Sequence, residues 1–93
     1  MKVRLTASAE ADIESIGDRI AEDDSNRARL TIRALRAAAR SIGGTPYLGS
    51  PVLSSSGVRK KSLRPHLLLY TIAAGEVVIL RIVHERSDWA ALA

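Results

Sequence analysis

Basic side chains gather in one short stretch of the sequence and at one later position. The five candidates for contact with a polyanionic target are Arg59, Lys60, Lys61, Arg64 and Arg81. Cleavage of RNA without a metal needs one group that activates the 2′-hydroxyl, another that protonates the leaving oxygen, and cations that stabilise the phosphate charge. For a nuclease the candidates are Lys60, Lys61, Arg64 and Arg81 as cations, with His84 as acid or base. The same cations also suit a protein that binds a nucleic-acid complex without cutting it.

The remaining chemically capable residues favour structural roles. A lone histidine at a strand end, as we expect for His84, is more often a hydrogen-bonding residue than a catalyst, and His66 follows Pro65 in an expected turn. Two histidines, no cysteine and scattered carboxylates do not make a metal site, so we expect neither a metal nor another cofactor. With three aromatic residues, stacking on single-stranded bases is disfavoured. We expect Tyr70 in the core with its hydroxyl at the rim, and Trp89 at an end of the core.

Charge is distributed unevenly along the chain. Residues 1–24 hold seven acidic and three basic side chains, whereas residues 25–66 hold nine basic side chains and no acidic one. Within the basic part, four arginines recur at helical spacing and predict a ridge along one helix face: Arg29, Arg33, Arg36 and Arg40. This arginine ridge either pairs with the acidic row Glu10, Glu14 and Asp18 on the preceding helix or offers a surface to an acidic partner.

Length and composition limit the kind of protein. Ninety-three residues with 46% apolar and 26% charged side chains predict one folded domain over residues 1–93. The absence of cysteine is compatible with a reducing compartment. No apolar run reaches the length of a membrane span, and carboxylates appear by position 10, where a signal peptide would need an apolar core. We therefore expect a cytoplasmic protein with no membrane contact.

Hydrophobic periodicity predicts the elements that position these residues. Residues 2–6 alternate as in a strand, and two helices follow, capped by Ser8 and Ser25, the second with a stripe of Ala28, Ile32, Leu35, Ala39 and Ile42. Residues 43–57 form a Gly-, Pro- and Ser-rich loop, and three antiparallel strands are predicted at 58–63, 67–72 and 77–83, followed by a helical turn over 87–93. The predicted fold is α+β, in the order β-α-α-β-β-β, with a helical hairpin on one face of an antiparallel-dominated sheet.

The last two predicted strands are apolar at both odd and even positions, although one helical hairpin can cover only one face of the sheet. If Val78, Leu80 and Ile82 point to the helices, the outward apolar residues are Val77, Ile79 and Val83, which, like the arginine ridge, are candidates for contact with a protein partner. The alternative is that the C-terminal tail, with Trp89 and Leu92, folds back over this face.

Several segments in this order resemble the RelE/ParE superfamily of small bacterial toxins, and the ParE branch in particular. An early strand precedes a helix that reads ASAEADIESIGDRI, and TPYLGSP follows the second helix. The most specific segments are VRKKSLRPHLLLYTI and VVILRIVHERSDW, whose Arg81, His84 and Ser87-Asp88 match the family's pattern. The resemblance spans nearly the whole chain.

This resemblance implies a growth-arresting toxin, of the kind used in plasmid stabilisation, that a co-expressed antitoxin neutralises. It makes the arginine ridge and the outward residues Val77, Ile79 and Val83 the candidates for contact with that antitoxin. ParE-like members poison DNA gyrase by trapping its DNA cleavage complex, whereas RelE-like members cut messenger RNA on the ribosome. RelE-like nucleases resemble one another in a C-terminal Tyr, and the matching position here is Ala90 or Trp89. The prediction is a non-enzymatic gyrase inhibitor in a hetero-oligomer with its antitoxin. The alternatives are a metal-independent endoribonuclease and an inert homologue that only binds the antitoxin and regulates its operon.

Overall fold

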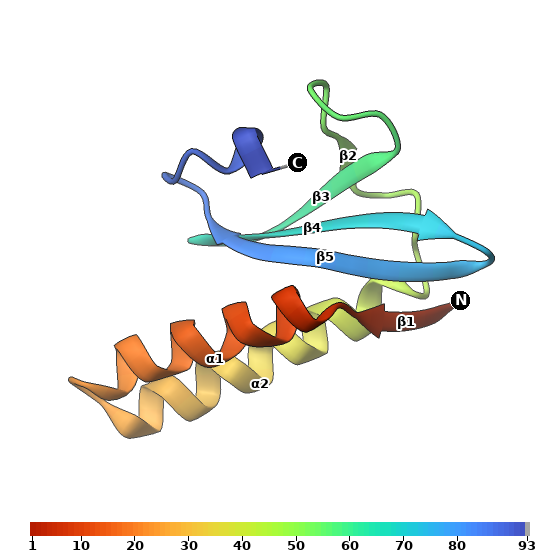
Figure 1. The fold of residues 1–93 in the computed structure, drawn as a ribbon. Helices are drawn as coiled ribbons and strands as arrows, with labels where there is room; N and C mark the ends of the chain where they lie inside the picture. Colours follow the sequence, from red (N-terminus) through yellow and green to blue (C-terminus); the bar gives the residue numbers. More distant parts are fainter. Residues whose placement is uncertain (93) are drawn as a thin grey trace.

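A helical hairpin and a five-stranded sheet make up the computed structural model, which describes residues 1–92 except the side chain of Leu92 (Figure 1). In chain order the elements are β1 (Lys2–Leu5), α1 (Ala7–Ala21), α2 (Ser25–Ile42), β2 (Ser50–Pro51), β3 (Val58–Leu63), β4 (His66–Ala73), β5 (Glu76–His84) and the 3₁₀ helix η1 (Trp89–Leu92). The expected contribution of the Leu92 side chain, and the expected helical conformation at Ala93, lie outside the described part.

The strands lie in the order β1-β5-β4-β3-β2. β1 runs parallel to β5, and the other pairs are antiparallel. The predicted α+β class and the order of the main elements are confirmed. The two-residue strand β2 lies inside the segment predicted as loop, where Ser50 and Pro51 pair with Lys60 and Arg59 of β3.

Both helices begin at a different residue from the one predicted. The side chain of Thr6, not Ser8, accepts a hydrogen bond from the amide of Ala9 and caps α1, while its hydroxyl donates to the carbonyl of Leu80 on β5. The side chain of Asp24, not Ser25, caps α2 by accepting from the amide of Arg27. Because Ser, Thr and Asp all cap helices well, the sequence offers neighbouring candidates for each cap. For α1, the capping residue Thr6 also makes a hydrogen bond to the distant strand β5.

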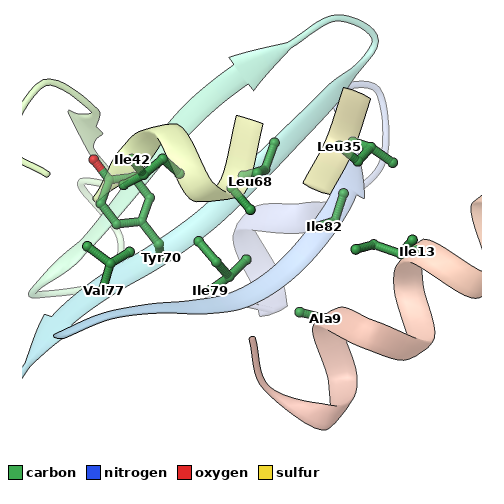
Figure 2. Packing of buried hydrophobic residues seen from close by; sticks show 10 residues of the cluster. Ala9, Ile13, Leu35, Ile42, Leu68, Tyr70, Val77, Ile79 and Ile82 are labelled. Atoms are coloured by element: carbon green, nitrogen blue, oxygen red, sulfur yellow. The ribbon is translucent and has the colours of Figure 1, made fainter. Parts of the chain in front are cut away.

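The main core lies between the helices and the sheet (Figure 2). The predicted stripe on α2 is confirmed, because Leu35, Ala39 and Ile42 are buried there against Leu68 and Tyr70 of β4. From α1, Ala9 and Ile13 enter the same core. The helical spacing of the apolar residues therefore gives the correct inner faces of both helices.

The predicted facing of β5 is wrong for Val77 and Ile79. Both are fully buried in the core on the helix side, and Ile82 faces the helices as well. Tyr70 pairs with Ile79 whereas Leu69 pairs with Arg81, so Leu80 is an extra residue in a β-bulge. A bulge changes the phase of side-chain alternation, which lets residues 77, 79 and 82 share one face. Val77 and Ile79 therefore offer no surface to an antitoxin.

Val83 does lie on the opposite face, as predicted, but that face is covered. Val83 is only 7% exposed and packs in a second apolar cluster with Leu67, Leu69 and Val52. Trp89 of η1 packs against this cluster, and η1 lies on the side of the sheet away from the helical hairpin (Figure 1). The alternative of a folded-back tail is thus confirmed for Trp89. The exposed large apolar side chains lie elsewhere: Met1, Leu30, Tyr47, Leu48 and Leu53.

Candidate functional site

Strand alternation separates the cations of β3. Arg59 pairs with Tyr70 and Lys61 with Leu68, and both of these partners belong to the helix-side core. Lys60 instead pairs with Leu69, which belongs to the opposite cluster. Because successive side chains of a strand point to opposite faces, Arg59 and Lys61 lie on one side of the sheet and Lys60 on the other. The five predicted target-binding residues therefore do not form one patch.

Arg59 supports the loop that precedes β2. Its guanidinium donates to the carbonyls of Tyr47 at 3.1 Å and Gly49 at 2.8 Å, and it lies 5.3 Å from the centre of the Tyr47 ring. The hydroxyl of buried Tyr70 donates to the carbonyl of Pro46 at 2.7 Å and accepts from the amide of Gly49 at 3.1 Å. These bonds fix the loop while leaving Tyr47 exposed. The sequence predicted this loop within residues 43–57, but none of its residues was named there as a functional candidate.

The side chains of Lys60, Lys61 and Arg64 make fewer contacts within the fold than that of Arg59. The ammonium of Lys60 lies 5.1 Å from the centre of the Trp89 ring, a distance typical of a cation–π contact. Lys60 and Lys61 also line a hollow of about 220 Å³ beside β3, together with Leu48. The side chain of Arg64 is 84% exposed and reaches Glu85 only at 4.0 Å. Such a distant surface pair contributes little, so Arg64 is available to a partner.

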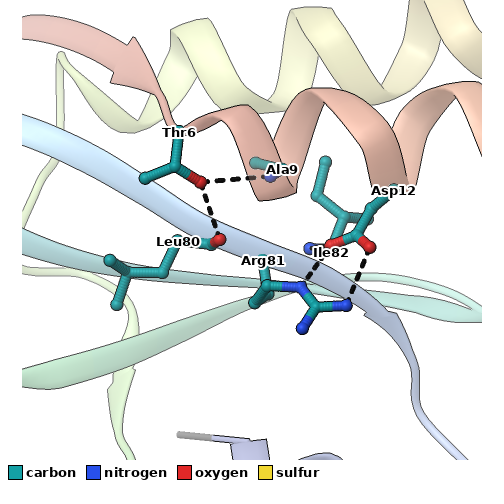
Figure 3. Close-up of polar contacts among 6 residues, drawn as sticks. All are labelled: Thr6, Ala9, Asp12, Leu80, Arg81 and Ile82. Carbon is teal, nitrogen blue, oxygen red and sulfur yellow. Dashed lines mark hydrogen bonds and ion pairs between the residues drawn. The ribbon is translucent and has the colours of Figure 1, made fainter.

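Arg81 is held by an ion pair (Figure 3). Its Nε and Nη2 donate to the two carboxylate oxygens of Asp12 at 2.8 and 2.9 Å, and the amide of Ile82 donates to the same carboxylate at 2.8 Å. The hydrogen bond that Arg81 donates to the Asp12 carboxylate raises the pKa of Arg81 above its usual value. Asp12 thereby also bonds a backbone amide of the β5 edge beyond the stretch that pairs with β1. Arg81 is therefore largely occupied within the fold.

The two histidines face each other across β4 and β5. His66 pairs directly with His84, and their ring centres lie 6.0 Å apart with the rings nearly perpendicular. Burial, with a smaller contribution from His84, lowers the pKa of His66. The Nδ1 of His84 accepts a hydrogen bond from the amide of Arg86 at 3.1 Å. The expected hydrogen-bonding role of His84 is confirmed, and that nitrogen is not available as a base in this arrangement.

The arginine ridge pairs with α1 at one position. Arg36 makes a bidentate pair with Glu10 at 3.1 and 2.9 Å, which raises the pKa of Arg36 and lowers that of Glu10. Arg29 donates to Asn26 within the same helix. Within residues 1–92, Arg33 and Arg40 make no side-chain hydrogen bond or ion pair and are exposed. Half of the ridge is thus available to a partner.

No group of three or more potential metal ligands lies close together in the described part of the chain. Neither helix of residues 1–92 has the length and apolar character that a membrane crossing requires.

Comparison with known proteins identifies the family. Solved structures with the same fold include the chromosomal ParDE toxin–antitoxin system from P. aeruginosa, with a TM-score of 0.81, 20% identity, and 90% of this chain and 95% of that chain covered. They also include the RelBE2 toxin–antitoxin complex from Mycobacterium tuberculosis, with a TM-score of 0.65, 27% identity, and coverage of 89% and 95%. No curated protein sequence matches significantly. The family model for the ParE toxin of the parDE type II toxin–antitoxin system matches residues 3–89, and the chain therefore belongs to the ParE toxin family.

Proposed function

We propose that this protein arrests growth by binding DNA gyrase and trapping the enzyme on cleaved DNA, and that a cognate antitoxin neutralises it. Membership of the ParE family supports the toxin role, and the resemblance drawn from the sequence supplies gyrase as the target. The proposal is of a binding protein and not of an enzyme.

The observation that carries this proposal is the position of Trp89. Where a RelE-like nuclease has a C-terminal Tyr, this chain has Ala90 or Trp89, and the Trp89 indole packs on the second apolar cluster with the Lys60 ammonium beside its ring. An indole exchanges no proton near neutral pH. The Nδ1 of His84 is occupied by the Arg86 amide. Loss of one general acid or base costs roughly 10² to 10⁴ in rate, so these contacts favour binding over cleavage.

Lys60, Lys61 and Arg64 are the proposed contacts with the gyrase–DNA complex. All three lie on β3 or the turn that follows it, with Lys60 and Lys61 on opposite faces of the strand. The side-chain contacts found for them within residues 1–92 are a cation–π contact of Lys60 and a long ion pair of Arg64. Arg59 and Arg81 support this surface indirectly, because each holds a neighbouring part of the fold. For the antitoxin, the exposed Arg33 and Arg40 of the arginine ridge offer an electrostatic surface.

The test is a gyrase assay with purified protein. The protein should inhibit supercoiling and increase the fraction of DNA that is cleaved and linked to gyrase, with an effect that weakens as salt rises. Replacing Lys60, Lys61 and Arg64 together by Ala should abolish both effects while circular dichroism reports an intact fold. The matched control replaces three exposed cations elsewhere, Lys2, Arg4 and Arg33, and should retain activity. Equal loss in both triple variants would leave only a non-specific charge effect and would contradict the proposed surface.

The second candidate is a ribosome-dependent endoribonuclease. The 27% identity and shared fold with the RelBE2 complex favour it, as does the exposed His84, which lines one hollow together with Arg19 and Arg27. Cleavage of ribosome-bound messenger RNA that disappears in His84→Ala, with no effect on gyrase, would establish this candidate in place of the first. A folded protein inactive in both assays would instead be an inert homologue that binds its antitoxin.

A further inference from the structure

The turn between α2 and β2 presents two neighbouring apolar side chains to solvent. Tyr47 is 65% exposed and Leu48 is 80% exposed. The amide of Leu48 donates to the carbonyl of Thr45 at 3.1 Å, which closes a four-residue β-turn over residues 45–48. Pro46 occupies the second position of this turn, where its fixed φ is favourable. An ordered turn therefore holds Tyr47 and Leu48 at the surface.

Two side chains of the sheet anchor this turn. The ring of Tyr70 is buried in the main core (Figure 2), and its hydroxyl bonds the Pro46 carbonyl and the Gly49 amide. The guanidinium of Arg59 donates to the carbonyls of Tyr47 and Gly49 and lies over the Tyr47 ring. Groups that are fixed before binding lose less conformational entropy when a partner covers them. The exposed Tyr47 is thus preorganised for contact with a partner.

The turn adjoins a lysine whose charge is not compensated. Leu48 and Lys61 line the same hollow of about 220 Å³, and no acidic side chain lines it. None of the ion pairs within residues 1–92 involves Lys61. Lys61 points to the helix side of the sheet, whereas Lys60 extends to the opposite face, beside Trp89. Tyr47, Leu48 and Lys61 therefore make up one surface at this end of the sheet, which we call the turn surface.

The composition of the turn surface favours a protein over a nucleic acid as its partner. A leucine offers neither charge nor a hydrogen bond to phosphate groups, and its removal from water is favourable only against an apolar surface. Tyrosine is enriched among the residues that dominate the binding energy of protein interfaces. A lysine at the border of such a contact matches a carboxylate on the partner. The turn surface thus fits an apolar protein patch with an acidic side chain at its edge.

We infer that the turn surface contacts the protein part of the gyrase–DNA complex, an inference that rests on the proposed function. Tyr47 and Leu48 are covered by an apolar patch of gyrase, and Lys61 pairs with a carboxylate beside that patch. A partner that reaches Lys61 covers Leu48 as well, because both residues line the same hollow. Lys60, on the opposite face of β3, is then the lysine of this pair that is available to the DNA.

The first test measures the binding of Tyr47→Ala to purified gyrase in the absence of DNA. Arg59 bonds the backbone carbonyl of Tyr47, which the substitution retains, so circular dichroism should report an intact fold. Titration calorimetry should show an affinity at least about tenfold weaker than that of the wild type, and Tyr47→Phe, which keeps the ring, should stay within about threefold of it. The matched control is Leu53→Ala, which removes a fully exposed apolar side chain beyond β2 and should change the affinity less than about threefold.

A photo-cross-linking amino acid in place of Tyr47 identifies the molecule that covers the turn. In the complex with gyrase and DNA it should capture a gyrase polypeptide, whereas the same probe in place of Leu53 should capture little. Binding of the wild type only when DNA is present, wild-type affinity of Tyr47→Ala, or cross-links from position 47 only to DNA would each overturn the inference. A wild-type protein that neither binds nor inhibits gyrase refutes the proposed function and this inference together. If the wild type and Tyr47→Ala inhibit gyrase equally, only the role of the turn surface is refuted.

Discussion

Replacing Asp12 by Asn should destabilise the protein far more than a change at the other carboxylate of α1 that binds an arginine. Asp12 accepts three hydrogen bonds, from Nε and Nη2 of Arg81 and from the amide of Ile82, and its side chain is only 15% exposed. Glu10 binds Arg36 with similar bidentate geometry, but the two side chains are 48% and 42% exposed. The two pairs thus have the same chemistry and differ in burial.

The expected magnitudes follow from that difference. A hydrogen bond to a charged group contributes about 1.5–3 kcal/mol when buried. The Asn side chain keeps one acceptor oxygen, and Arg81 is partly solvated, so we expect a loss of about 2 kcal/mol for Asp12→Asn and somewhat more for Asp12→Ala. An exposed ion pair contributes about 0.2–1 kcal/mol, which bounds the effect of Glu10→Gln. For a domain of this size, about 2 kcal/mol corresponds to a decrease in Tm of roughly 10 °C.

Equilibrium unfolding in urea, followed by circular dichroism, measures both variants under the same conditions. The free energy of unfolding should fall in the order wild type, Glu10→Gln, Asp12→Asn, with an unchanged dependence on urea concentration. If Asp12→Asn lowers the free energy of unfolding no more than Glu10→Gln does, burial does not make the Asp12–Arg81 pair more stabilising than the exposed Glu10–Arg36 pair. Arg81 would then be free to act in target binding.

Three further changes test other parts of the fold. Tyr70→Phe should reduce the free energy of unfolding by about 1–2 kcal/mol, measured by denaturant titration, because the Pro46 carbonyl and Gly49 amide lose their buried partner. Gly49→Ala should cost about 1–3 kcal/mol in the same assay, since an added Cβ would meet the Lys60 carbonyl at 2.9 Å and the Tyr70 hydroxyl; Gly44→Ala, where the nearest atom is 3.7 Å away, is its control and should change little. The pKa of His66 is lowered in the folded state, so the folded protein binds fewer protons there than the unfolded chain, and its contribution to stability is present above the ordinary value near 6.5 and lost as the pH falls below it. Thermal melts should show a smaller decrease in Tm between pH 7.5 and 5.5 for His66→Gln than for the wild type; an equal decrease would contradict this role of His66.

The helical part of the fold was predictable because its signals agree with one another. Apolar residues at spacings of three and four define the inner face of α2, and Gly43-Gly44 follows its end. Which side chains of β5 point to the helices was not predictable in the same way. Where both phases of a strand are apolar, as in β5, alternation gives no preference, and nothing in the sequence marks the extra residue at Leu80.

The candidate site was predicted in its residue types but not in its grouping. Neighbours such as Lys60 and Lys61 appear as one cluster in the sequence, yet a strand sends them to opposite faces. Arg59 and Arg81 carry the same charge as Lys61 and Arg64, but their guanidinium groups donate hydrogen bonds to other segments of the chain. Only tertiary structure distinguishes an arginine that holds the fold from one that is available to bind.

The start of α1 explains which parts of the sheet remain open to a partner. β1 pairs with β5 only as far as Ile79, so the rest of this β5 edge would present unpaired backbone groups. The Thr6 hydroxyl donates to the Leu80 carbonyl, and the Asp12 carboxylate accepts from the Ile82 amide (Figure 3). The N-cap and the first two turns of α1 therefore close that edge with side chains, and the bulge at Leu80 brings Arg81 to the same carboxylate. Because this edge is closed and Trp89 of η1 packs on the outer face, a partner that adds a strand to the sheet cannot do so at this stretch of β5 without displacing Thr6 and Asp12.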